Sequence, residues 1–316
     1  MEVELRMRVE DKKYKSVNGK NHIHVKIWYP DCDKKDIKGV IQIAHGMIDH
    51  IGRYGDMAEY FAQKGYVVAG NDHLGHGDSV GGKEDYGYFT EGNASLCVVD
   101  DMYRLTRIMK KEYGEFPYIL IGHSMGSFLS RRYMSMYGHE LDCAILLGTG
   151  NQPYSVVKAG LFLAKAVKLL KGERYRSKFL NQVMFGLYNK RIEEALTDKD
   201  WVCSDNNVVK EYMKDEKCDF IFTVNGYIGL LSTIDYVKKE ANIRKIPRKL
   251  PVLIAVGEED PVGGYGKDVK KLFDIYSRYL DDVELRIYEE CRHELHNESV
   301  KYNVFEDMYE WIQAAL

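Results

Sequence analysis

Hydrophobic positions along the chain follow two alternating patterns. Short apolar runs, the first preceded by an Asn18-Gly19 turn typical of a hairpin, predict strands at residues 24–29, 40–44, 66–69, 118–121, 144–147, 252–256 and 283–288. Segments with helical periodicity predict helices at residues 57–64, 96–113 and 128–137. Residues 1–8 alternate charged and apolar side chains and are expected to form a first strand. This succession predicts an α/β fold with a mostly parallel central sheet and helices on both faces.

The alternation lapses between residues 151 and 246, where the sequence is helical and poor in strands. Because strands resume at residue 252, we expect a helical cap or lid, residues 151–246, inserted late in the sheet of a core formed by residues 1–150 and 247–316. Residues 154–170 predict a helix with an apolar face and neighbouring lysines. That face, which comprises Val157, Leu161, Ala164 and Leu169, either packs on the core or contacts a lipid substrate as part of a lid.

Composition narrows the partners and the compartment. The 316 residues carry a formal charge of −3 with acids and bases interspersed, which is not typical of a nucleic-acid surface and favours a small or lipid-like partner. No apolar run is long enough to span a membrane, and the first residues lack the apolar core of a signal peptide. Six scattered cysteines show no metal or redox spacing, so we expect no disulfides and a cytoplasmic location.

The most informative motif is Gly122-His123-Ser124-Met125-Gly126, which follows an apolar strand and precedes a helix. In a nucleophile elbow, a sharp turn from strand to helix exposes a serine hydroxyl at the end of the sheet, and small residues must flank it. Ser124 is therefore the candidate nucleophile. His123 adjoins it, but neighbouring side chains diverge at a tight turn, so we expect His123 to have a packing role.

A serine hydroxyl needs a base to accept its proton and an acid to orient that base. In this topology both follow the serine along the chain and lie after strands. The loop after residues 252–256 offers Asp260, whose short side chain and following proline suit a fixed acid, with Glu259 as the alternative. The loop after residues 283–288 offers His293 as the base, with His296 as the alternative.

Two backbone N–H groups are expected to form an oxyanion hole for the charge on the substrate carbonyl oxygen. One belongs to Met125, directly after the nucleophile, and the other to Met47, in the loop His45-Gly46-Met47 after a strand. Gly46 permits a close approach of the backbone or is an ordinary turn glycine.

The loop at residues 71–79 contains Asp72, His73 and His76, which could ligate a metal ion. Its glycines and serine favour instead a tightly folded loop in which His76 and Asp78 bond to backbone groups.

With these residues in view, the chain resembles the α/β-hydrolase superfamily and, within it, the monoacylglycerol lipase and lysophospholipase group of serine hydrolases. The similarity is carried by five segments: His45-Gly46 with Gly52-Arg53-Tyr54, residues 72–79, residues 122–126, residues 257–262 and residues 293–298. The resemblance implies an α/β-hydrolase fold, with Ser124, Asp260 and His293 as catalytic residues and the Met47 and Met125 amides as the oxyanion hole. It also implies that the cap selects the substrate.

The predicted function is hydrolysis of a carboxylic ester, most readily a monoacylglycerol or lysophospholipid, through an acyl-enzyme on Ser124. A short-chain carboxylesterase, a thioesterase, a peptidase of the same fold and a catalytically silent binding module are the alternatives. No metal or organic cofactor is needed. We expect no nucleic-acid partner, transient contact of the cap with a membrane surface, and no sequence feature that sets the oligomeric state.

Overall fold

A single sheet of eight strands organises the part of the chain that the computed structural model describes, residues 8–316. The strands are β1 (Arg8–Lys15), β2 (His22–Tyr29), β3 (Gly39–Ala44), β4 (Tyr66–Asn71), β5 (Tyr118–His123), β6 (Cys143–Leu147), β7 (Val252–Gly257) and β8 (Val283–Tyr288). Their order in the sheet is β1-β2-β4-β3-β5-β6-β7-β8. β2 pairs antiparallel with β1 and β4, and all pairs from β4 to β8 are parallel. The predicted hairpin and mostly parallel sheet are confirmed.

The first strand begins at Arg8, so most of the strand predicted at residues 1–8 lies outside the described residues. The helices are α1 (Gly55–Gln63), α2 (Ala94–Tyr113), α3 (Met125–Tyr137), α4 (Tyr154–Lys171), α5 (Lys178–Phe185), α6 (Asn206–Lys214), α7 (Val224–Val237), α8 (Glu240–Ile243), α9 (Lys267–Tyr276) and α10 (Lys301–Ala315). The three helices predicted before residue 140 are α1, α2 and α3, each beginning two or three residues earlier than expected.

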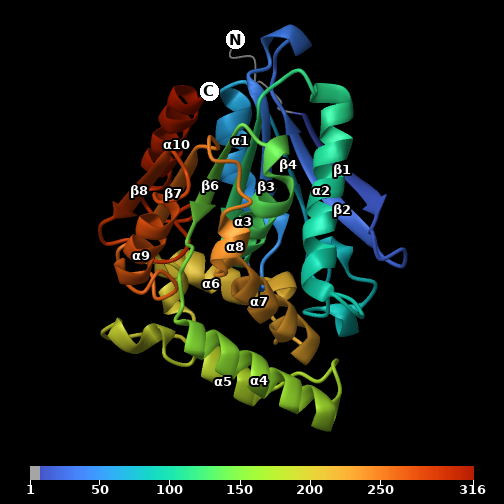
Figure 1. The fold of residues 1–316 in the computed structure, drawn as a ribbon, viewed down its shortest axis with the longest axis vertical. Coiled ribbons are helices and arrows are strands. Elements are labelled where there is room, and N and C mark those ends of the chain that lie inside the picture. Colours follow the sequence, from blue (N-terminus) through green and yellow to red (C-terminus); the bar gives the residue numbers. More distant parts are fainter. Residues whose placement is uncertain (1–7) are drawn as a thin grey trace.

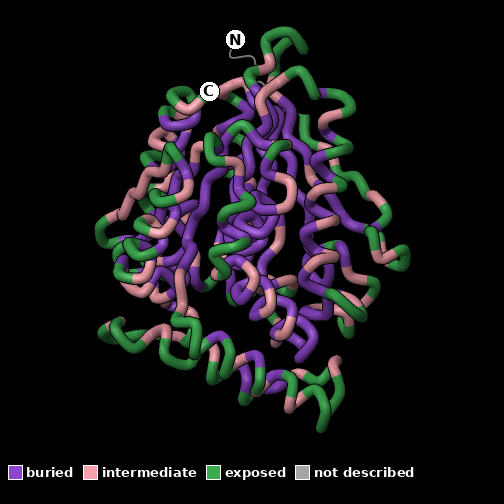
Figure 2. The backbone as a smooth tube through the Cα atoms, in the orientation of Figure 1, coloured by how far each residue is buried: buried purple, intermediate pink, exposed green. Residues whose placement is uncertain are grey.

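Two apolar cores lie on opposite faces of the sheet. Alternate side chains of the central strands point to opposite faces, so Ile41 and Ile43 of β3 belong to the core that α1 and α10 cover, whereas Val40 belongs to the other. α2, α3 and α9 cover that second face (Figure 1). Both faces are therefore buried, and the sheet runs as a buried layer through the molecule (Figure 2). This explains the nearly continuous apolar runs of the central strands.

The segment between β6 and β7 contributes helices α4 to α8. α4 and α5 lie side by side as an outer layer below α6 and α7 in Figure 1, and α7 packs on α2, α3 and α4. Val157, Leu161 and Ala164 of α4 are buried as predicted, but Leu169 is 88% exposed. The prediction for Leu169 is wrong because five residues from Ala164 turn its side chain about 140° around the helix, away from the buried face. Residues 168–172 at the end of α4 are all exposed.

All six cysteines are free thiols, and four of them are buried. Between residues 8 and 316, no helix combines the length and the apolar character that crossing a bilayer requires.

Candidate active site

Ser124 occupies the sharp turn between β5 and α3. Its φ of +53° lies in the left-handed region, which residues other than glycine adopt under strain. The flanking glycines make this turn feasible, because a Cβ on Gly126 would overlap the carbonyl group of Ala44 and a Cβ on Gly122 would overlap Ser130 Oγ. The turn leaves the Ser124 side chain partly exposed at the end of the sheet, as a nucleophile elbow requires.

Two later loops bring a histidine and an aspartate to this serine. His293 follows β8, and its Nε2 lies 2.8 Å from Ser124 Oγ. Asp260 follows β7, and its Oδ1 lies 3.0 Å from His293 Nδ1. The ring N–H does not point straight at that oxygen, an alignment common in catalytic sites without substrate, which tighten on binding. Since Asp260 and His293 are almost fully buried, the pair is shielded from water.

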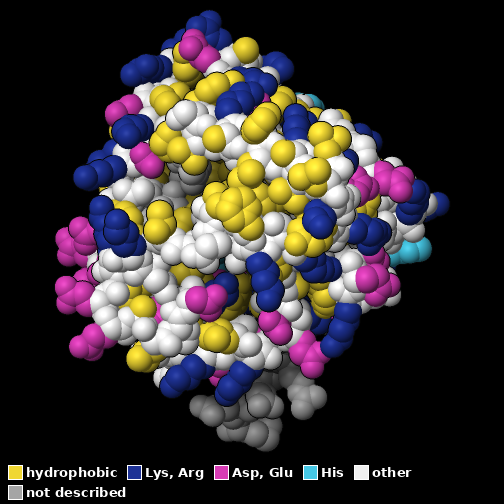
Figure 3. Space-filling model, turned by 90° about the horizontal axis from the view of Figure 1, so that it is seen from below, with side chains coloured by type: hydrophobic (Ala, Val, Ile, Leu, Met, Phe, Trp, Pro, Cys, Tyr) yellow, Lys and Arg dark blue, Asp and Glu magenta, His cyan; other side chains and the backbone are white. Residues whose placement is uncertain are grey.

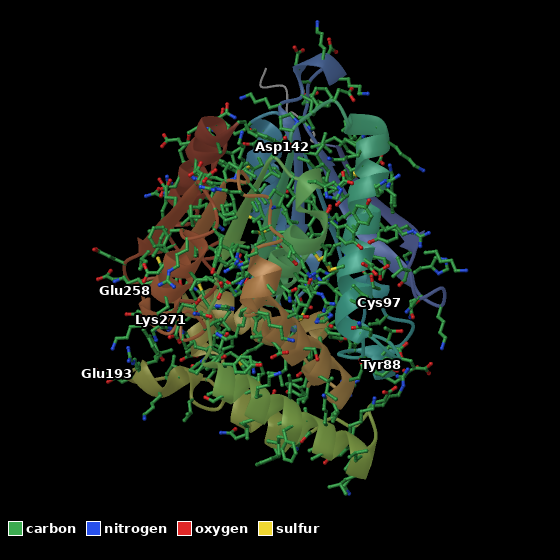
Figure 4. All side chains as sticks on the ribbon, viewed as in Figure 1. Tyr88, Cys97, Asp142, Glu193, Glu258 and Lys271 are labelled. Atoms are coloured by element: carbon green, nitrogen blue, oxygen red, sulfur yellow. The ribbon has the colours of Figure 1, made fainter. Side chains whose placement is uncertain are left out.

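The residues considered as the alternative acid and the alternative base lie away from Ser124. Glu259 is exposed and faces Arg292, whose Nε lies 3.4 Å from Glu259 Oε2. Glu258, in the same loop, lies at the outer edge of the molecule (Figure 4). His296 is buried and stacks on the Tyr54 ring at a centroid distance of 4.4 Å, without a hydrogen bond to Ser124 among the described residues.

His123 has the packing position expected from its place at the turn. Its ring lies between those of His293 and His296, and its Nδ1 is 2.9 Å from the Tyr54 hydroxyl. Burial lowers the pKa of His123 well below the usual value, so the ring is neutral at physiological pH.

The pKa of His293 is set by two opposing effects. Burial lowers it, because a charged ring loses hydration, but the neighbouring Asp260 carboxylate outweighs this and raises the net value above 6.5. A base must be neutral to accept the serine proton. We therefore expect kcat/KM for ester hydrolysis to fall as pH drops through a midpoint above 6.5.

A pH–rate profile of the wild type and of Asp260→Asn checks this expectation. Removing the carboxylate removes the effect that raises the pKa, so the acidic limb of the remaining activity moves to lower pH in the variant. If the acidic limb of the profile did not move in Asp260→Asn, that limb would report the titration of a group other than His293.

The loop after β3 runs against the nucleophile. A Cβ on Gly46 would lie 3.3 Å from Ser124 Cβ, so only glycine fits comfortably here. His45 Nε2 accepts the backbone N–H of His73, which leaves His45 Nδ1–H to donate to the Gly46 carbonyl at 2.8 Å. In a trans peptide the next N–H, that of Met47, points away from this carbonyl.

The Met47 and Met125 N–H groups have no protein acceptor among residues 8–316. Both residues line the same pocket as Ser124 and His293. Met125 is the first residue of α3. The first N–H groups of a helix have no partner within the helix and can bind a negative charge.

The empty space in and around this pocket, open solvent included, amounts to about 980 Å³. Seven residues of its apolar lining come from α4, α5 and α7: Val156, Val157, Met184, Phe185, Leu230, Leu231 and Ile234. The polar lining includes Asp49 and Glu294, which share Arg53 as a partner through contacts of 3.1 and 2.6 Å. Burial alone would raise the pKa values of both carboxyls, but the guanidinium outweighs it, and both stay ionised.

The loop at residues 71–79 is tied to its own backbone. Asp72 accepts the N–H groups of Ile51 and Asp78 at 2.8 Å each, and His76 Nδ1 lies 3.0 Å from the Leu74 carbonyl oxygen, as expected for His76. The expectation for Asp78 is wrong, because its carboxylate pairs with Lys217 rather than with backbone. In this loop the carboxylate of Asp72, rather than that of Asp78, bonds to backbone N–H groups.

Gly148, after β6, is a residue of the site that sequence reasoning missed. It has φ +52°, and a Cβ there would lie 3.1 Å from His293 Nδ1. The only sequence signal is a glycine directly after a buried strand. Gly148→Ala is expected to destabilise the fold by about 1–2 kcal/mol and to displace the imidazole, lowering kcat/KM by up to about 10²-fold.

Gly19→Ala is the matched control for this prediction, because Gly19 also has a positive φ but has open space around its Cβ position. It should lose stability without a matching loss of kcat/KM. Equal kcat/KM losses in the two variants would show that the His293 contact is unimportant.

Comparison with known proteins identifies the family of the chain. Residues 35–300 match the family described as serine aminopeptidase, S33. The chain is 26% identical to a monoacylglycerol lipase of Mycolicibacterium smegmatis, covering 92% of both chains, and 26% identical to a monoglyceride lipase of Rattus norvegicus, covering 92% of this chain and 86% of the relative.

Among solved structures, a thermostable carboxyl esterase from Bacillus coagulans in complex with glycerol superimposes with a TM-score of 0.91. It is 26% identical, and the match covers 98% of this chain and 99% of the esterase. The predicted α/β-hydrolase fold is thereby confirmed. The match to the S33 family spans most of the chain, and this protein therefore belongs to the serine aminopeptidase S33 family of α/β-hydrolases.

Proposed function

We propose that the protein is a serine hydrolase that cleaves the ester bond of long-chain monoacylglycerols. The observation that carries this proposal is the contact of 2.8 Å between Ser124 Oγ and His293 Nε2 at an apolar pocket. The names of the relatives, which include monoacylglycerol lipases and a carboxyl esterase crystallised with glycerol, support the same substrate class.

The proposed reaction proceeds through an acyl-enzyme. Ser124 Oγ attacks the ester carbonyl carbon while His293 Nε2 takes its proton, and the N–H groups of Met47 and Met125 stabilise the oxyanion. His293 then protonates the departing glycerol oxygen, which leaves the acyl group on Ser124. Water, deprotonated by His293, attacks this ester, and the fatty acid leaves as Ser124 regains the proton. Asp260 holds the imidazole in the required tautomer and stabilises its cation.

The polar part of the pocket favours a neutral alcohol over a phosphate head group. Asp49 and Glu294 each bring a carboxylate, and Arg53 supplies one positive charge between them. Lys199 also lines the pocket and lies 3.4 Å from the Asp198 carboxylate, so these five groups together are negative. A phosphate brought close to them would be repelled in this buried setting, whereas glycerol hydroxyls can donate to the carboxylates. A monoacylglycerol therefore fits this pocket better than an anionic lysophospholipid.

The closest rival functions differ in acyl length and in the bond cleaved. A short-chain carboxylesterase, a thioesterase and a peptidase can all use the same residues, and the family description mentions an aminopeptidase. The apolar lining from α4, α5 and α7 favours a long acyl chain over the short acyl group that a small-ester carboxylesterase removes. The bond cleaved distinguishes the thioesterase and the peptidase. A silent binding module is disfavoured because Ser124, His293 and Asp260 are all chemically competent.

Nitrophenyl esters with two to sixteen acyl carbons, compared with the matched nitroanilides and thioesters, test this proposal. We expect kcat/KM to be highest for long-chain oxygen esters. An optimum at two to four carbons would favour a small-ester carboxylesterase, and faster amide or thioester cleavage would favour a peptidase or a thioesterase. A sixteen-carbon monoacylglycerol should also react faster than its lysophosphatidate analogue.

Residues 151–246 are proposed to act as a cap over a core of residues 1–150 and 247–316, since α4, α5 and α7 line the pocket.

The outer face of the cap is proposed to contact membranes transiently. Apolar side chains gather over the face seen from below, with basic side chains around them (Figure 3). On α4, on α5 and just after α5, five apolar side chains are more than half exposed: Phe162, Leu169, Leu170, Phe179 and Leu187. The free cysteines fit a reducing compartment such as the cytoplasm.

Vesicle sedimentation tests the membrane contact. Replacing Leu169 and Leu170 together by glutamate should weaken binding to vesicles that contain anionic lipid, since two apolar anchors are lost and negative charge is added. Ile108→Glu, at an exposed apolar position on α2, is the control and should bind as the wild type does. Equal binding by all three proteins would argue against the contact.

A further inference from the structure

The loop that carries the Met47 N–H contains a residue in an unfavourable backbone conformation. Ile48 has φ +53°, which a β-branched side chain rarely adopts, and it lies directly after Met47. Such a conformation persists when surrounding contacts hold it in place. The contacts around residues 46–50 therefore decide whether the Met47 N–H stays directed into the pocket.

The core holds this loop at Asp49. Asp49 Oδ2 accepts the Gly46 N–H at 3.1 Å and the Tyr54 hydroxyl at 2.7 Å, and its Oδ1 accepts from Arg53. These groups all lie before or at the start of α1. They leave the carbonyl of Ile48 and Nε2 of His50 without a partner from the core among the described residues.

The segment inserted between β6 and β7, which contains α4 to α8, supplies both missing partners. The Tyr212 hydroxyl, on α6, donates to the Ile48 carbonyl oxygen at 3.0 Å. At the end of the same helix, Asp215 Oδ2 lies 2.8 Å from His50 Nε2. His50 Nδ1 accepts the Gly52 N–H at 3.2 Å, so Nε2 carries the proton and donates to Asp215.

The Tyr212 contact is well defined. Its side chain is buried, and the Arg53 guanidinium lies over one face of its ring, 4.7 Å from the centre, which restricts movement of the ring. The Ile48 carbonyl thus receives a buried hydrogen bond whose donor cannot easily turn away. Loss of that bond would leave a buried acceptor unsatisfied and would favour a different conformation of Ile48.

We propose that α6 positions the oxyanion hole: Tyr212, with Asp215 in support, holds Ile48 in its left-handed conformation and so keeps the Met47 N–H directed at the substrate carbonyl. Tyr212 and Asp215 are positioning residues that act through the loop. This inference rests on the proposed role of Met47 in ester hydrolysis. It makes kcat depend on where the inserted segment lies, so a ligand or surface that shifts α6 changes the rate of the chemical step.

Tyr212→Phe tests the proposal, because it keeps the ring over Arg53 and removes only the hydroxyl. We expect kcat for a long-chain ester to fall about tenfold, part of the 10²–10³-fold that loss of an oxyanion donor costs, while KM stays within about twofold. Tyr227→Phe is the control, since the Tyr227 hydroxyl bonds to Asn181 within the inserted segment and Tyr227 does not line the pocket. It should keep the wild-type kcat.

Tyr212 lines the pocket as well as bonding to the loop, and two inhibitors separate positioning from substrate contact. A long-chain alkyl trifluoromethyl ketone forms an adduct with Ser124 that carries an oxyanion, whereas a monoalkylglycerol ether has no carbonyl group. Tyr212→Phe should weaken binding of the ketone by the same factor by which it lowers kcat, and it should leave the affinity for the ether unchanged. If Tyr212→Phe kept the wild-type kcat and the wild-type affinity for the ketone, the proposal would be overturned. A change in Tyr212→Phe confined to KM and to the affinity for the ether would also overturn it.

Asp215 provides the rescue experiment. Asp215→Asn keeps an oxygen that accepts from His50 and should retain most of kcat, whereas Asp215→Ala should lower it. Equal kcat in the two variants would remove Asp215 from the proposal.

Amide hydrogen exchange gives a readout that does not depend on activity. Peptides covering residues 45–50 should exchange faster in Tyr212→Phe than in the wild type or Tyr227→Phe. If exchange rises but the wild type shows no Ser124-dependent hydrolysis, the proposed function fails and the contact between α6 and the loop stands. Unchanged exchange at residues 45–50 would overturn the inference itself.

Discussion

Ser124→Ala is expected to lower kcat on ester substrates by about 10⁴–10⁶-fold while the protein stays folded. The hydroxyl is the only group at the turn that can form the acyl-enzyme, and its one hydrogen-bond partner among the described residues is His293. Alanine keeps the same backbone, so the unfolding temperature should change little. Steady-state turnover of a long-chain nitrophenyl ester, measured beside thermal unfolding, checks both expectations.

Ser127→Ala serves as the control for the serine substitution. Ser127 lies in the first turn of α3, and its hydroxyl donates to the Ser124 carbonyl at 2.6 Å rather than to His293. It should retain far more turnover than Ser124→Ala. A folded Ser124→Ala protein that keeps more than a few per cent of wild-type turnover would remove Ser124 from the mechanism.

Asp260→Asn is expected to lower kcat by about 10⁴-fold, because an amide can orient the imidazole in the wrong tautomer and cannot stabilise its cation. Asp260 is fully buried and also accepts the Val262 N–H at 2.8 Å, which an asparagine oxygen can still do. The loop should therefore keep its shape. The loss should appear in kcat more than in KM, and single-turnover kinetics would place it in the chemical steps.

Glu259→Gln is the matched control, since it alters the adjacent carboxylate, which is exposed and faces Arg292. Its kcat should stay within about twofold of the wild type, as expected for an exposed ion pair. A large loss in Glu259→Gln with little loss in Asp260→Asn would reverse the assignment of the acid.

Local patterns were enough to predict the elements that position the site. The elbow at Ser124 depends on its own glycines and on the strand and helix beside it, so five residues in context identify it. The loops that carry Asp260 and His293 follow strands whose apolar runs are nearly continuous, because both faces of the sheet are covered. Parallel strands then bring their carboxyl ends to one edge of the sheet.

Contacts between distant segments could not be predicted in the same way. The hydrogen bond from Tyr212 to Ile48 joins residues 164 positions apart, and no periodic pattern indicates it. The exposure of Leu169, by contrast, follows from helical geometry, because its five-residue spacing from Ala164 turns its side chain about 140° around the helix, away from the buried face. Asp78 faces Lys217 because the inserted segment passes close to the loop at residues 71–79.

The most direct test of the central claim is the release of glycerol and fatty acid from a sixteen-carbon monoacylglycerol by the wild type and by Ser124→Ala. The account predicts equal amounts of the two products from the wild type, at a rate well above that with a two-carbon monoacylglycerol, and no significant release by Ser124→Ala. Release that survives the substitution, or a wild type that prefers the two-carbon substrate, would contradict it.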